Sequence, residues 1–158
     1  MWFGTQDGLN RYDGYDFTVF DNDPQDPTSL AVGWTWSLVE DTRADIWVGT
    51  HGGGLHRFLP ERNAVERFVT NPQDPSSLSH DHVRTITEDA TGTLWAGTDG
   101  GGINLFAPET SAFAHLRYDP DDPDSLSDDR VRVIRETDNG STWVGTYEHG
   151  LDRFDPVT

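Results

Sequence analysis

The sequence predicts an all-β protein in which one four-stranded antiparallel unit is repeated along the chain. The motif Trp-x-Gly-Thr occurs four times, at residues 2–5, 47–50, 95–98 and 143–146, and its tryptophans are 45, 48 and 48 residues apart. Each motif is followed by a turn that contains glycine and then by a short apolar run, which reads GLNRY, GLHRF, GINLF and GLDRF. No segment carries a convincing helical stripe. Such a period, together with strand signals, predicts a series of small β-sheets.

The third unit shows all four expected strands. Residues 83–88 alternate in side-chain type with a period of two, as a strand requires. The turn DATG leads to residues 93–98, which hold the tryptophan motif. A glycine turn then leads to residues 102–108, which end at a proline, and residues 112–118 complete the unit. Four short antiparallel strands at this period predict one blade of a β-propeller.

The whole chain is expected to be an incomplete arc of about three and a half to four such blades. We place the blades at approximately 1–23, 33–70, 81–119 and 129–158. The sequence opens directly on Trp2, so the first blade should lack its innermost strand, and the last blade should lack an outermost strand. Closed rings typically need four to eight blades. Two alternatives are therefore open: the chain is part of a longer propeller, or it closes its ring as a homodimer.

The glycine turns at 52–54 and 100–102 invite comparison with a phosphate-binding loop. A phosphate loop lies once in a chain, between a strand and a helix, and usually carries lysine followed by serine or threonine. Here the turn recurs four times between strands, and the chain has no lysine. We interpret these glycines as residues that supply backbone angles closed to other residues. The motif tryptophans, Trp2, Trp47, Trp95 and Trp143, are expected to be structural residues that pack between blades.

These repeats resemble the two-component regulator propeller repeat. The resemblance rests on DIWVGTHGGGLHRFLPE, TLWAGTDGGGINLFAPET and STWVGTYEHGLDRFDPVT, and on a D-P-x-S-L-S loop followed by V-x-x-I-x-E-D. The resemblance implies a periplasmic or extracellular sensor propeller of many repeats, placed ahead of a smaller β-sandwich, a membrane span and a cytoplasmic output such as a histidine kinase or diguanylate cyclase. It further implies a signal that is often a carbohydrate. The family fixes no catalytic residues, so none is carried over to this chain.

The composition excludes several classes of partner and site. The formal charge is −17; 21 of the 28 acids are aspartate, and all 11 basic residues are arginine. Such a surface repels nucleic acid and anionic lipid headgroups, and it is typical of a chain adapted to high salt. Without cysteine there is no disulfide, no thiolate nucleophile and no cysteine-ligated zinc site. No stretch is long and apolar enough to span a membrane, no signal peptide is visible, and no cofactor is indicated.

The best candidates for ligand binding lie where the repeats differ from one another. In a propeller the start of each inner strand and the turn after the tryptophan strand emerge together around the central mouth. Polar, aromatic and charged side chains at these positions would suit a small polar ligand such as a carbohydrate. The alternative is that these are ordinary loop and strand-end positions, at which the residue type varies without a functional reason. The candidates are Trp34, Trp36, His51, His82, Arg84, Asp99, Arg130, Arg132 and Tyr147.

Other functions have weaker support in the sequence. The acidic stretch at 119–129 holds many carboxylates but lacks the glycine and terminal glutamate of an EF-hand loop, so we expect no metal site. Carboxylates are paired in many places, yet no catalytic base stands out. The sequence therefore favours a non-catalytic ligand-sensing propeller. An assembly scaffold that closes by self-association, and a propeller lyase or glycosidase, are the competing classes.

Overall fold

The computed structural model describes residues 1–23, 25, 29–31 and 34–155, and within these ranges every helix or strand is a β-strand. The first two sheets comprise β1 (Trp2–Thr5), β2 (Gly8–Tyr12), β3 (Phe17–Phe20), β4 (Thr35–Glu40), β5 (Ile46–Thr50), β6 (Leu55–Leu59) and β7 (Ala64–Phe68). The last two comprise β8 (Val83–Glu88), β9 (Leu94–Thr98), β10 (Ile103–Ala107), β11 (Ala112–Leu116), β12 (Val131–Glu136), β13 (Thr142–Thr146) and β14 (Leu151–Phe154). No helix in the described ranges could cross a membrane.

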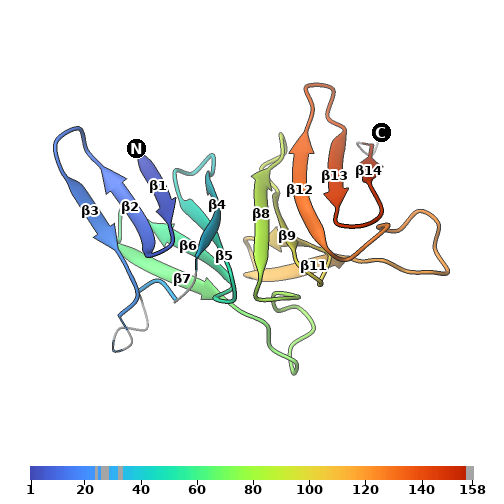
Figure 1. The fold of residues 1–158 in the computed structure, drawn as a ribbon, viewed down its shortest axis with the longest axis horizontal. Coiled ribbons are helices and arrows are strands. Elements are labelled where there is room, and N and C mark those ends of the chain that lie inside the picture. Colours follow the sequence, from blue (N-terminus) through green and yellow to red (C-terminus); the bar gives the residue numbers. More distant parts are fainter. Residues whose placement is uncertain (24, 26–28, 32–33, 156–158) are drawn as a thin grey trace.

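Each sheet is an antiparallel meander in which every strand pairs with its neighbour in sequence. In the described ranges, the orders are β1-β2-β3, β4-β5-β6-β7, β8-β9-β10-β11 and β12-β13-β14. The four sheets follow one another as an open arc, with β4, β8 and β12 as innermost strands (Figure 1). The predicted all-β propeller fold is therefore confirmed, with three, four, four and three strands. The proposed blade boundaries stay a prediction, and residues 33 and 156–158 at their ends lie outside the described part.

Among the described residues, the hydrophobic core forms three clusters, one at each junction between sheets. At the second junction Trp47 is almost fully buried, and its ring stacks on Phe68 of its own sheet and meets Phe106 of the next edge-on. Trp2 and Trp95 pack at the first and third junctions. Trp143 belongs to the last described sheet, has no following sheet against it in the described ranges, and is 37% exposed. The motif tryptophan thus packs between sheets wherever a following sheet is present.

The glycine of the motif allows the next sheet to approach closely. A Cβ built on Gly97 would lie 2.6 Å from the Cγ1 of Val131 in the next inner strand and 2.7 Å from the Cγ2 of Thr85. At Gly49 the corresponding distance to the Cγ1 of Val83 is 2.9 Å. Because no side chain fits between these strands, the junction requires glycine at this position.

The Glu-Asp pair at the end of an inner strand ties neighbouring sheets together. Asp89 accepts a hydrogen bond from the indole Nε1 of Trp95 at 2.8 Å. The preceding residue, Glu88, accepts one from the backbone N–H of Thr42 in the sheet before, also at 2.8 Å. Burial opposes the charged form of Asp89, but hydrogen bonds from Thr91, Trp95 and the backbone outweigh it and lower the pKa of this carboxyl. One dipeptide therefore fixes both the motif tryptophan and the junction.

Candidate ligand-binding site

The glycine turns beside the inner strands are fully engaged in structure. The N–H groups of Gly52 and Gly54 donate to the backbone carbonyl of Asp81 in the next sheet, at 3.2 and 2.9 Å. The remaining N–H of this turn, on Gly53, donates to the Oγ1 of Thr50 at 3.0 Å. The turn at 100–102 repeats this pattern with the carbonyl of Asp129 and the hydroxyl of Thr98. No N–H group of either turn is left for a phosphate, because neighbouring protein atoms already accept from them.

Each complete inner strand carries a β-bulge at one of the predicted site residues. The pairing shifts register between Thr35 and Ser37, between Val83 and Thr85, and between Val131 and Val133. The residues left without a partner are Trp36, Arg84 and Arg132. The strict alternation predicted for 83–88 is therefore wrong, because the extra residue lets Val83 and Ile86 both be buried. Bulges re-aim side chains and are common beside functional sites.

Backbone hydrogen bonds join the remaining candidates in pairs. In the last three motifs, the N–H of the residue after the threonine donates to the carbonyl at the start of the inner strand of the same sheet. These bonds run from His51 to Trp34 at 2.9 Å, from Asp99 to His82 at 3.0 Å, and from Tyr147 to Arg130 at 2.9 Å. Isolated β-bridges connect neighbouring sheets, pairing His51 with His82 and Asp99 with Arg130. The structure thus places all nine candidates at the starts of the inner strands or directly after the tryptophan strands of three adjacent sheets, and we call this set the inner ridge.

Aromatic rings fill the half of the inner ridge between the second and third sheets. The His51 ring lies 4.5 Å from that of Trp36 and 4.4 Å from that of His82, edge-on in both cases. The guanidinium carbon of Arg84 lies 4.3 Å from the Trp36 ring centroid, a cation–π contact that holds this side chain in place. Trp34 lies 6.1 Å from His51 and is 54% exposed. This half offers aromatic faces and a stacked cation.

Ion pairs dominate the other half, between the third and fourth sheets. Arg132 pairs with Asp99 across the junction at 3.3 Å, and its guanidinium carbon lies 4.3 Å from the Tyr147 ring centroid. Arg130 lies over the same ring at 4.8 Å and pairs with Glu148 at 2.8 Å. Tyr147 itself is 56% exposed. The cations here are largely neutralised by neighbouring carboxylates.

Three residues that the sequence analysis did not single out also belong to this region. The His80 ring lies 5.1 Å from that of His82, and its Nδ1 accepts the N–H of His82 at 3.1 Å. Asp128 occupies the same repeat position one blade later and pairs with Arg130 at 3.3 Å. Glu148 takes the place of a turn glycine. The alignment of the repeats could have pointed to all three. His80 and Asp128 stand two residues before His82 and Arg130, and Glu148 stands inside the turn.

The electrostatics of the inner ridge favour neutral histidine in the third sheet. Burial lowers the pKa of His82, the nearby His51 and His80 lower it further, and Asp99 and Asp81 act in the opposite direction. In the fourth sheet, the hydrogen bonds that Arg130 donates to Glu148 and Asp128 raise the pKa of Arg130 above its already high ordinary value. The two halves therefore differ in their charge at neutral pH.

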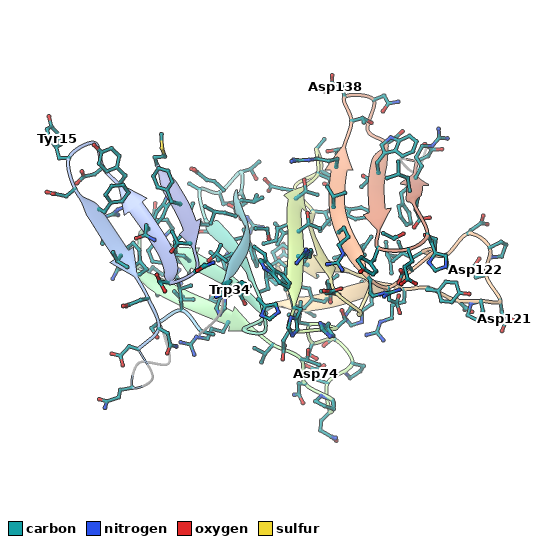
Figure 2. The ribbon with its side chains drawn as sticks, viewed as in Figure 1. Tyr15, Trp34, Asp74, Asp121, Asp122 and Asp138 are labelled. Carbon is teal, nitrogen blue, oxygen red and sulfur yellow. The ribbon has the colours of Figure 1, made fainter. Side chains whose placement is uncertain are left out.

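The aspartate-rich loop lies apart from this site. Figure 2 shows Trp34 at the centre of the arc, whereas Asp121 and Asp122 lie at the far end of the loop that follows β11. In that loop Asp119 Oδ1 accepts the N–H of Asp121, and Asp122 Oδ1 accepts that of Asp124, both at 3.0 Å. Within the described ranges, no three acidic or histidine side chains are grouped so that they could hold a metal ion.

Two repeats of this chain match a known family in sequence. Residues 77–100 and 125–148 match the two component regulator propeller family. Over 31 residues, 20% of this chain and 2% of the relative, the chain is 48% identical to Histidine kinase P4 of Formosa agariphila.

The structural similarity extends over nearly the whole chain. An extracellular domain described as that of the hybrid two component system BT3049 from B. thetaiotaomicron is 26% identical with a TM-score of 0.83, over 96% of this chain and 21% of that one. The corresponding domain of BT4673 from the same organism has the same fold, at 24% identity and a TM-score of 0.76, over 96% and 19% of the two chains. This chain thus spans about a fifth of the length of these solved chains. The two matched repeats and the shared fold together support a two-component regulator propeller.

Proposed function

We propose that this chain is a non-catalytic, ligand-sensing segment of a periplasmic or extracellular bacterial signal receptor. The observation that carries the proposal is the inner ridge, because three blades of the same architecture present different aromatic, basic and acidic side chains at equivalent positions. The similar solved chains support a sensor role, since they are extracellular domains of two-component systems.

The chemistry of the inner ridge fits a small polar ligand such as an oligosaccharide. Trp34 and Tyr147 expose more than half of their surface, and aromatic faces stack on the apolar faces of sugar rings. Arginine and aspartate side chains beside them supply hydrogen bonds for hydroxyl groups. The protein groups are held in place by bulges, backbone bonds and ring contacts, which reduces the entropy cost of binding.

Calorimetry against a panel of neutral and charged oligosaccharides tests the proposal, with Trp34→Ala and Trp36→Ala as site variants. Tyr15→Ala is the control, because Tyr15 is an exposed aromatic that lies at a hairpin tip far from the ridge (Figure 2). We expect either site variant to weaken binding by about tenfold or more, and the control to bind normally. Equal binding by all three variants contradicts the proposal. Turnover of a saccharide that is lost in Asp99→Asn would instead indicate an enzyme.

A second function, closure by self-association, is favoured by the two outer faces of the arc. On the first sheet Phe3, Phe17 and Val19 are exposed, and on the last sheet Trp143 and Leu151 are exposed. These are the faces against which a neighbouring blade would pack. The occupant is either the remainder of a longer propeller chain or a second copy of this chain.

A further inference from the structure

Two arginines at equivalent bulge positions have opposite surroundings. Arg132 of the fourth sheet reaches across the junction to the carboxylate of Asp99 at 3.3 Å. Arg84 stands at the same position one blade earlier, and the residue equivalent to Asp99 is His51. Among the described residues, no carboxylate lies within ion-pair distance of Arg84 and no group accepts a hydrogen bond from its guanidinium. The chain therefore contains one filled and one unfilled copy of the same arginine site.

The unfilled copy is preorganised. Arg84 is half-buried and stacked on Trp36, so the face of the guanidinium is occupied while the N–H groups at its edge stay free. His51 and His82 lie beside that ring at contact distance. An unneutralised, half-buried arginine is unusual in a chain with 28 acids and 11 arginines.

We propose that Arg84 binds an oxyanion group, a carboxylate or a sulfate, of the ligand that the inner ridge accepts. This inference rests on the proposed ligand-sensing function and specifies the ligand class. The oxyanion takes the place that the Asp99 carboxylate has beside Arg132, and it accepts charge-assisted hydrogen bonds from the guanidinium fork. His51 and His82 lie beside the Trp36 ring on which Arg84 stacks, and a protonated His82 would strengthen the binding. The strongly acidic surface repels other anions, so binding depends on this local contact.

Four variants separate this inference from general binding. Arg84→Gln removes the cation and keeps hydrogen-bonding capacity. His51→Asp introduces a carboxylate at the position that Asp99 has relative to Arg132. This carboxylate should pair with Arg84 and take the place of the ligand oxyanion. Asp99→His is the converse change and leaves Arg132 free for a second oxyanion. Arg153→Gln is the matched control, because Arg153 also lies over a tryptophan but pairs with Asp155 at the outer edge.

The measurement is calorimetry of the full 158-residue chain at physiological ionic strength, with thermal unfolding as a check that each variant folds. The probes are an oligogalacturonate for the carboxylate, a sulfated carrageenan oligosaccharide for the sulfate, and maltohexaose as the neutral saccharide. We expect at least one anionic probe to bind more tightly than maltohexaose. Arg84→Gln and His51→Asp should each weaken that probe by about tenfold or more, and Arg153→Gln should not. Asp99→His should raise the affinity or the stoichiometry.

Proton linkage gives an independent readout. The groups that face His82 are His51, His80, Asp99 and Asp81. The pKa of His82 lies below its ordinary value of 6.5, and a bound oxyanion favours the protonated ring. Affinity for the anionic probe should therefore rise as the pH falls below about 6.5, while affinity for maltohexaose should not.

Equal binding of the anionic probes by the wild type and Arg84→Gln overturns the inference. Binding of maltohexaose that depends on Trp36, with no preference for either anion, overturns the inference and leaves the proposed function standing. Absence of binding by every saccharide overturns both.

Discussion

Acidification below pH 6.5 should destabilise this protein through His56. This side chain is completely buried in the second sheet, and its Nε2 accepts a hydrogen bond from the backbone N–H of Ala31 at 3.2 Å. Burial, helped by the positive charge of Arg67, lowers the pKa of His56 from 6.5 to about 4. A protonated imidazole would turn two N–H donors toward protein and lose this acceptor. The folded state therefore holds His56 neutral.

The magnitude follows from this difference in pKa between the folded and unfolded chains. A depressed histidine pKa means that the unfolded chain takes up the proton first, so the contribution of His56 is complete above pH 6.5 and falls as the pH drops toward 4. At about 1.4 kcal/mol per pKa unit, the full loss is about 3 kcal/mol. Domains of this kind are stable by about 5–15 kcal/mol, so the loss is readily measured.

The third sheet suggests the matched variant. Asn104 occupies the equivalent position and accepts the N–H of Ser79 at 2.8 Å without a titratable group. Urea unfolding followed by tryptophan fluorescence, between pH 7.5 and 4.5, should show His56→Asn losing about 2–3 kcal/mol less than the wild type. Asn104→His should add a similar pH dependence. The wild type and His56→Asn contain the same carboxylates, so an equal loss of stability in both proteins would refute the assignment to His56.

Three further predictions concern the junctions, the acidic surface and assembly. Gly97→Ala should lower the free energy of unfolding in urea by about 1–3 kcal/mol, because the new Cβ meets Val131 and Thr85. Gly145→Ala should lower it less, because its Cβ meets mainly the exposed Val133. Equal losses would contradict the role of the glycine in the junction. Stability should rise from dilute to molar sodium chloride as like charges are screened, and calcium at equal ionic strength should add nothing; a specific calcium effect would make the 119–129 loop a metal site. Light scattering after size exclusion should show a dimer or poor solubility, because the outer faces are exposed; a monodisperse, cooperatively folded monomer would rule this out.

The fold was predictable because its information is local and repeated. Each blade is specified by the Trp-x-Gly-Thr motif, by turns rich in glycine and by strand periodicity, and four aligned copies reinforce one another. The same alignment named all nine residues of the inner ridge, since equivalent positions in equivalent blades must lie near one another. It did not single out His80, Asp128 or Glu148, because their importance depends on contacts with residues of the ridge and not on their own type.

The sequence alone determined that the chain forms blades, where the strands lie and which positions face the inner strands, because these depend on short-range patterns. Only the tertiary structure decided how those positions are used. The β-bulges at Trp36, Arg84 and Arg132 are features of the backbone, and the residue types at these positions do not predict them. Whether an arginine is neutralised depends on the residue across the junction. Arg132 pairs with Asp99, whereas the position equivalent to Asp99 one blade earlier is His51, and Arg84 stacks on Trp36. The energy of an ion pair depends on the distance between its two charged groups, and the packing of neighbouring blades sets that distance.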